Sequence, residues 1–163
     1  EAAVVPLWDP LAVGICMGVG AGARLPLRIG GKFEPQSGPC HDAAEAEVLF
    51  VKRDAFQNQL ASERIPLGDI AVVRVEGIEV MLTSRRSNVY DPSIFALHGI
   101  DIASKRVISV KNLFKQYDLF KPLVRDQLFV ASPGTSNPDW TALPFGRLPR
   151  PVWPLDPDPL GLD

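Results

Sequence analysis

The sequence predicts an α/β domain, with α+β as the alternative, built on a mixed parallel and antiparallel sheet of about five to six strands with packed helices. Asp69–Val75 and Ile78–Ser84 alternate in polarity and flank Glu76-Gly77, which predicts an antiparallel hairpin. Strand-like and helix-like segments then alternate as far as Ala131, a pattern typical of parallel strands joined by right-handed crossovers. The 163 residues are 46% hydrophobic, enough for one domain to form a core without disulfides.

Local signals mark the remaining elements. Asp9 suits an N-cap and Pro10 a first helical turn, so a short helix is expected from Asp9 to Met17. Asp91-Pro92 repeats these signals and predicts a helix to about His98, closed by Gly99. The other predicted elements are strands over Arg24–Ile29, Glu45–Lys52, Arg106–Val110 and Gln127–Ala131, and a helix over Leu113–Val124 that breaks at Pro122.

The composition changes from Ser132 onward. Eight of the 16 prolines lie in the last 32 residues, which excludes helix and central strand there. Trp140, Phe145 and Trp153 also lie in this segment, and bulky aromatic residues are expected to pin it across the surface. We therefore predict a single domain over residues 1–163, with a core over 1–131 and a Pro-rich tail over 132–163 packed on its surface.

Charge and cysteine content exclude several classes of protein. The 17 basic and 19 acidic residues give a net charge of −2, so no field attracts nucleic acid or an anionic membrane. No apolar run approaches the ~20 residues of a membrane span. Two cysteines, Cys16 and Cys40, favour a reducing compartment, and we expect the cytoplasm. The start at Glu1 is expected for a processed chain, a truncated one or the ordered part of a longer protein.

A glycine run from Gly18 to Ala23 matches the G-x-G-x-x-G/A pattern of dinucleotide-binding sites. That site requires a strand before the glycines and a helix after them, so that the helix N-terminus meets the pyrophosphate. Here a helix is predicted before the run and a strand after it. We therefore interpret the glycines as a helix end followed by a turn.

No metal site and no catalytic residue are predicted. Cys40-His41-Asp42 offers three metal-type side chains, but adjacent residues rarely converge on one ion, and a catalytic zinc needs about three protein ligands. His98 is expected in the last turn of a helix, where a cation interacts well with the helix dipole. Ser84 lacks the G-x-S-x-G elbow of a hydrolase nucleophile.

Arg85 and Arg86 follow a predicted strand and precede a predicted helix, where open α/β sheets bind ligands. Arginine captures anions through paired hydrogen bonds. Neighbouring side chains of a strand point to opposite faces, so Arg86 is in phase with Ile78, Val80 and Leu82, and Arg85 is not. The two arginines therefore cannot grip one ligand unless the chain bends. The alternative is an ion pair with Asp91 or with a carboxylate of the tail.

Four stretches resemble a known family: LRIGGKFEPQSG, VMLTSRRSNVYDPSIFALHGID, PGTSNPDW and RPVWPLD. Together they are similar to the C-terminal domain of the MlrC family, the microcystinase C type of candidate zinc metallopeptidases, from about Trp8 to Asp156. The resemblance implies that the zinc ligands, an acidic residue and histidines, belong to a larger N-terminal domain. It therefore implies no cofactor in this chain and the N-terminal catalytic domain as its partner.

The sequence also departs from the family. Lys111 is kept, but Lys115 stands where the family usually has a histidine, which implies altered substrate choice or weakened activity. We hypothesise an accessory domain of a zinc hydrolase that acts on amide bonds of small or cyclic peptides. It would line one wall of the cleft, with Arg85, Arg86 and Lys111 as candidate anion-binding residues. The alternative is a purely structural or homo-oligomerisation module without a role in substrate binding.

Overall fold

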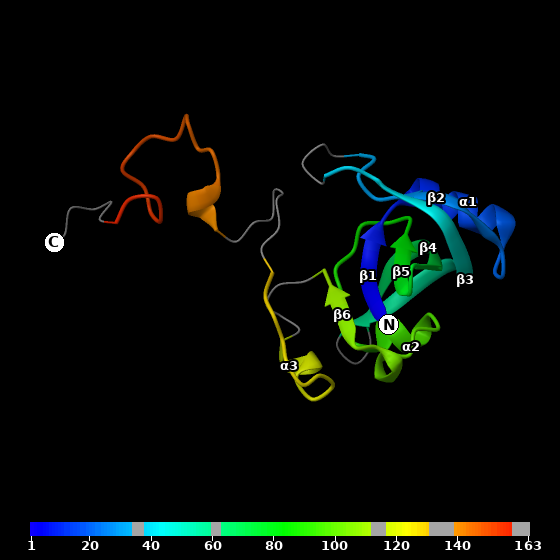
Figure 1. Cartoon of the computed structure of the whole chain (residues 1–163). Helices are drawn as coiled ribbons and strands as arrows, with labels where there is room; N and C mark the ends of the chain where they lie inside the picture. Colours follow the sequence, from blue (N-terminus) through cyan, green and yellow to red (C-terminus); the bar gives the residue numbers. More distant parts are fainter. Residues whose placement is uncertain (34–37, 60–62, 112–116, 131–138, 158–163) are drawn as a thin grey trace.

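The computed structural model describes residues 1–33, 38–59, 63–111, 117–130 and 139–157. Its centre is a six-stranded sheet in the order β2-β3-β4-β5-β1-β6 (Figure 1), which confirms the predicted mixed α/β architecture. The strands are β1 (Ala2–Trp8), β2 (Arg24–Ile29), β3 (His41–Gln59), β4 (Glu63–Val75), β5 (Ile78–Thr83) and β6 (Val107–Val110). The helices are α1 (Pro10–Val19), α2 (Ser93–Leu97) and α3 (Tyr117–Phe120), with 3₁₀ turns at Ile102–Ser104 and Trp140–Ala142.

The sheet is antiparallel on one side and parallel on the other. Strands β2 to β5 pair antiparallel in sequence order, and the predicted hairpin turns at Glu76-Gly77. Strand β1 pairs parallel with both β5 and β6. The predicted parallel relation of β5 and β6 is therefore confirmed, but β1 lies between them.

Strand β1 was not predicted from the sequence. Pro6 interrupts its apolar run, and proline is rare inside a paired strand because it lacks the N–H that the ladder needs. The structure accommodates it with a register shift between Val4 and Leu7 in the pairing with β5. A bulge therefore lets a central strand carry a proline.

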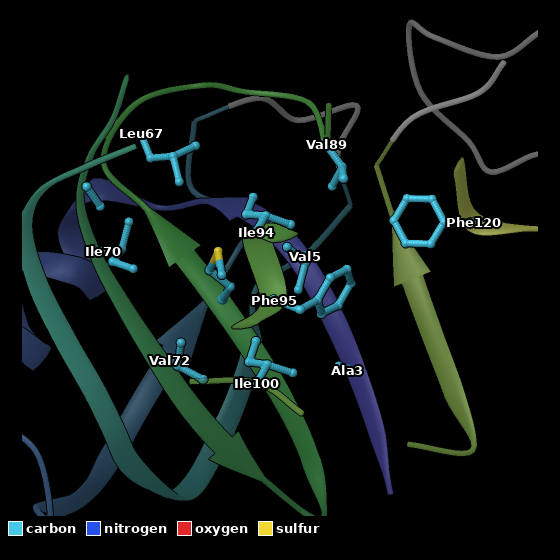
Figure 2. Packing of buried hydrophobic residues seen from close by; sticks show 12 residues of the cluster. Ala3, Val5, Leu67, Ile70, Val72, Val89, Ile94, Phe95, Ile100 and Phe120 are labelled. Carbon is cyan, nitrogen blue, oxygen red and sulfur yellow. The ribbon is translucent and has the colours of Figure 1, made fainter. Parts of the chain in front are cut away.

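Each face of the sheet has its own core. On one face Ile70, Val72 and Met81 pack with Ile94 and Phe95 from the α2 region (Figure 2). On the other face Ala12, Val13 and Cys16 of α1 pack against a cluster that includes Leu27, Val73 and Leu82. Both faces are thus covered over much of their area, as expected for a sheet that contains parallel strands.

Two predicted elements near the C-terminus differ in the described residues. Of the helix predicted over Leu113–Val124, residues 113–116 lie outside the described ranges, and the rest is helical only over α3. Residues 127–130 do not form the predicted strand, and Leu128 and Val130 are 87% and 77% exposed. Apolar alternation alone did not produce a strand because these residues pair with no neighbouring strand among the described residues.

The described part of the tail is largely exposed. Residues 139–157 lie apart from the sheet in Figure 1, and Trp140 and Trp153 are 57% and 70% exposed. These two side chains therefore do not pin the tail to this domain. The division into a core over 1–131 and a tail over 132–163 stays a prediction. No helix in the described ranges is long and apolar enough to cross a membrane.

Candidate functional site

An open cleft of about 480 Å³ lies at the carboxyl-terminal end of β1, on the face of the sheet that also carries α1. This volume is within the range of small-molecule sites, roughly 300–1,000 Å³. The cleft extends along β1 and β5 toward the β4–β5 turn. Its described lining includes apolar side chains of the sheet, two aromatic rings and three cations: Val4, Leu7, Val80, Trp8, Phe33, Lys32, Arg86 and Lys111.

The three parallel strands explain why these groups meet. The carboxyl ends of parallel strands lie at the same edge of a sheet, where open α/β sheets bind ligands. Trp8 ends β1, Arg86 follows β5 by three residues, and Lys111 follows β6 directly. The Lys111 N–H donates to Val5 O at 3.1 Å, which continues the β1–β6 pairing to this residue.

Trp8 is the central aromatic residue of the cleft. Its Nε1–H donates to Ser84 O at 3.1 Å, which holds the indole against the end of β5. The Cζ of Arg86 lies 3.9 Å from the centroid of the Trp8 ring, a cation–π contact. The ring centroids of Trp8 and Phe33 are 4.5 Å apart. One guanidinium is thereby placed beside an aromatic surface that an apolar ligand group could contact.

Asp9 holds the wall of the cleft next to Trp8. Its carboxylate is fully buried, and it accepts hydrogen bonds from Ala12 N–H at 3.0 Å and Gly30 N–H at 2.9 Å. It also forms an ion pair with Lys32. The predicted N-cap of α1 is confirmed, and the same carboxylate ties the loop after β2 to the end of β1. Lys32 is thus positioned by a buried partner.

Arg85 and Arg86 are both exposed and lie beyond the end of β5 at Thr83, where the chain bends and strand periodicity no longer applies. Arg86 lines the cleft, together with Val80 from the same face of β5. Arg85 is exposed and lies beside the bulge of β4: its N–H donates to Leu67 O at 3.0 Å. Within the described residues, Arg85 has no ion pair with Asp91, whose carboxylate instead accepts from Ser93 N–H at 2.7 Å. Of the three candidate anion-binding residues, the structure brings Arg86 and Lys111 to one cleft and leaves Arg85 outside it.

The other candidates from the sequence have structural roles or remain separate. The Ser84 hydroxyl accepts from Asp69 N–H at 2.8 Å, so it fixes the β4–β5 pairing. Asp42 pairs with Arg28 on the surface at 2.7 Å, whereas His41 lines the cleft. Among the described residues, no three His, Cys, Asp or Glu side chains lie close enough to share a metal ion. The glycine run follows α1 and precedes β2, which is the order that we predicted.

His98 differs from the prediction of a cation at a helix end. It is completely buried, and its Nε2 lies 3.0 Å from Phe56 O. Burial lowers the pKa of His98 below 6.5, because the charged form would lose its hydration. His98 is therefore a neutral core residue.

Sequence reasoning did not select Trp8, Lys32 or Phe33. Trp8 and Lys32 belong to segments that meet only through β1, and that strand was not predicted. The one local signal was the tripeptide Gly30-Gly31-Lys32, which was interpreted as a turn.

The fold and the cleft define an α/β domain with an apolar, cation-bearing cleft at the carboxyl edge of its parallel strands. The family described as MlrC C-terminus matches residues 1–147, and the chain belongs to this family. The chain is 31% identical over 152 residues to microcystinase C of Sphingomonas sp, covering 93% of this chain and 29% of that protein.

A crystal structure supports the same relationship. It is that of a protein from Mesorhizobium sp. BNC1 named as a candidate metallopeptidase, which is 26% identical, with a TM-score of 0.80. The match covers 95% of this chain and 31% of that chain. The chain therefore spans less than a third of the length of both relatives.

Proposed function

We propose that this chain is the accessory C-terminal domain of an MlrC-type metallopeptidase, packs on a larger catalytic domain, and supplies one wall of its substrate cleft. The observation that carries the proposal is the convergence of Arg86, Lys111 and Lys32 on an apolar cleft at the carboxyl edge of the parallel strands. The family and the similarity to a candidate metallopeptidase support a peptide-like substrate. An anionic group of that substrate, such as a carboxylate, would lie at the cations.

The cleft residues suit binding and orientation. Arg86 contacts the Trp8 ring, which limits the positions of its guanidinium before a ligand arrives. Such preorganisation lowers the entropic cost of binding. Lys32 forms an ion pair with Asp9. We assign the direct contact with the anion to Arg86 and Lys111, which line the cleft beyond the ends of β5 and β6. The apolar surface of Val4, Leu7 and Val80 would contact the side chains of the substrate.

Metal chemistry is assigned to the partner domain. The described residues of this chain offer no group of three suitable ligands, so they do not fit a catalytic zinc site. The two free cysteines, Cys16 and Cys40, support a reducing compartment, and we place the protein in the cytoplasm as part of the proposal.

The test compares neighbouring arginines in the full-length parent protein. Its substrates are two versions of one short peptide, one with a free carboxylate and one with a C-terminal amide. Arg86→Ala should raise KM for the carboxylate peptide about tenfold, since one charge-assisted hydrogen bond contributes roughly 1.5 kcal/mol. The amidated peptide should be affected much less, and Arg85→Ala should change neither value.

Two results would contradict this assignment. If Arg85→Ala and Arg86→Ala raise KM for the carboxylate peptide equally, the position of Arg86 in the cleft does not determine carboxylate binding. Unchanged kinetics in Arg86→Ala and Lys111→Ala would favour the alternative, a structural or oligomerisation module without a role in substrate binding.

A further inference from the structure

The C-terminal third of the chain exposes an unusual amount of apolar surface. We call the described residues 117–130 and 139–157 the arm. Its exposed large apolar side chains are Tyr117, Leu119, Leu123, Leu128, Phe129, Val130, Trp140, Leu148 and Trp153. Single exposed apolar residues are ordinary, but a group of this size marks a surface that another protein covers.

The arm is attached to the domain at its beginning. Phe120 of α3 is 5% exposed, and its ring packs edge-on against Phe95 at 6.2 Å (Figure 2). The Tyr117 and Phe129 rings stack at 5.9 Å. Among described residues, the hydrogen bonds and ion pairs of residues 140–157 all join partners within residues 139–157. The far part of the arm is therefore held by its own contacts.

Those contacts build a defined loop around Trp153. Arg150 Nε donates to Asp156 Oδ2 at 2.6 Å, and Arg150 Nη2 donates to Leu155 O at 3.1 Å. The Val152 N–H also donates to Asp156 Oδ2 at 2.6 Å, and Asp156 N–H donates to Val152 O at 2.9 Å. The hydrogen bond from Arg150 lowers the pKa of Asp156. The Asp156 carboxylate is therefore ionised at neutral pH, where its bonds to Arg150 close the loop. Trp153 lies within this closed loop and is 70% exposed.

A tryptophan on a preformed loop is suited to anchor an interface. Tryptophan is enriched among the residues that contribute most to binding, and an ordered loop loses little entropy on docking. The exposed apolar residues Leu128, Phe129 and Val130, in the first part of the arm, would add to the buried area. Their apolar character indicates a stable partner rather than a transient polar one.

The lengths of the relatives indicate the partner. Residues 1–116 are less than three quarters of this chain, so a structural match over 95% includes most of the arm. The match to the solved relative therefore extends into the arm, within a chain of which this domain matches 31%. Microcystinase C is likewise much longer than the matched region. In both relatives, the region that matches this chain is thus part of a longer chain, about two thirds of which lies outside the match.

We propose that the arm is a docking surface for the N-terminal portion of the MlrC-type parent chain, with Trp153 on the Arg150–Asp156 loop as its main anchor. This inference rests on the proposed function for the identity of the partner. It adds the surface through which the two parts are held together. The cleft at Arg86 is a separate site, so docking and substrate binding can be tested independently.

The experiment measures association rather than activity. The N-terminal portion of the parent is produced separately and titrated with this chain by calorimetry, and analytical ultracentrifugation gives the mass of each species. We expect a 1:1 complex whose Kd rises about 30-fold or more in Trp153→Ala, the loss typical of an anchor residue. Arg150→Gln should weaken binding less, because it loosens the loop without removing the ring.

A matched control uses another exposed apolar residue. Leu11 of α1 is 57% exposed, like Trp140, but lies outside the arm, so Leu11→Ala should leave Kd unchanged. All variants should keep the thermal midpoint of this chain, because the replaced side chains are exposed. Arg86→Ala should bind the N-terminal portion normally, which separates a failure of the proposed function from a failure of docking.

Three outcomes would overturn the inference. One is the absence of any complex between the two parts. Another is a complex that Leu11→Ala weakens and Trp153→Ala does not, which would place the interface on α1. The third is a dimer of this chain alone that Trp153→Ala dissociates, which would make a second copy the partner of the arm.

Discussion

Replacing Asp9 by alanine removes the carboxylate that joins β1, α1 and the loop after β2. The variant loses the N-cap bond to Ala12 N–H, which contributes about 1 kcal/mol. It also leaves the Gly30 N–H without its acceptor, which costs roughly 1–2 kcal/mol for a buried donor. Lys32 loses its partner but can turn toward water. We therefore expect Asp9→Ala to lower the free energy of unfolding by about 2–3 kcal/mol and Tm by about 4–12 °C.

The assay is urea denaturation of this chain, followed by circular dichroism at pH 7. Asp9→Asn keeps an oxygen for Ala12 N–H but places an NH2 group where Oδ2 accepts from Gly30 N–H, so it should lose about 1–2 kcal/mol. Asp42→Ala is the matched control, because Asp42 also pairs with a cation near this loop but is exposed, and it should leave stability unchanged. If Asp9→Ala and Asp42→Ala have the same midpoint, the buried carboxylate does not hold the loop, and our account of the cleft wall is wrong.

Two further predictions concern His98 and a pair of glycines. Burial lowers the pKa of His98 below 6.5, so on acidification the unfolded chain binds a proton at higher pH than the folded chain. The free energy of unfolding should therefore be highest above about pH 6.5. Below that pH it should fall by up to about 1.4 kcal/mol per pH unit. His98→Gln should remove this slope in urea titrations at pH 7.5 and 5.5; an unchanged slope would assign it to other groups. Gly68 and Gly77 both have positive φ, but a Cβ at Gly68 would lie 2.2 Å from Ser84 Oγ, whereas a Cβ at Gly77 meets nothing within 4 Å. Gly77→Ala should lower the free energy of unfolding by about 1 kcal/mol, because of backbone strain alone. Gly68→Ala should lower it by at least about 1 kcal/mol more, because its Cβ also clashes with Ser84. Equal losses in the two variants would refute the contribution of this clash.

Local sequence signals predicted those parts of the fold whose causes lie within a few residues. The hairpin at Glu76-Gly77 follows from alternation on both sides of a turn, and the start of α1 follows from Asp9 and Pro10. The order of helix, glycines and strand also excluded a dinucleotide site, because that site depends on local order. These features are specified by short-range sterics and hydrogen bonding.

The strand between β5 and β6 could not be predicted in this way. Pro6 lowers the strand propensity of β1, and only parallel pairing on both sides, together with a bulge, compensates for the lost hydrogen bond. The reverse holds for residues 127–130, which have strand-forming side chains but pair with no strand among the described residues. In both cases the long-range pairing decided the outcome.

The candidate site shows the same division. Periodicity along β5 predicted that Arg85 and Arg86 point to opposite faces. In the structure β5 ends at Thr83 and the chain bends at residues 84 and 85, and Arg86 lines the cleft whereas Arg85 does not. Periodicity could not tell which face carries a cleft, because that depends on Trp8, 76 residues from its hydrogen-bond partner Ser84. The ion pair between Asp9 and Lys32 likewise spans 23 residues and forms only when β1 and β2 are in place.

The sequence by itself therefore determined the mixed sheet, the N-cap of α1 and the turn at Glu76-Gly77, because each depends on neighbouring residues. The tertiary structure alone decided that Arg86 and Lys111 share a cleft with Trp8, that His98 is neutral, and that the arm is exposed. Those properties depend on which distant surfaces are brought together. The physical reason is that burial, charge pairing and parallel strand contacts are set by the packed chain as a whole.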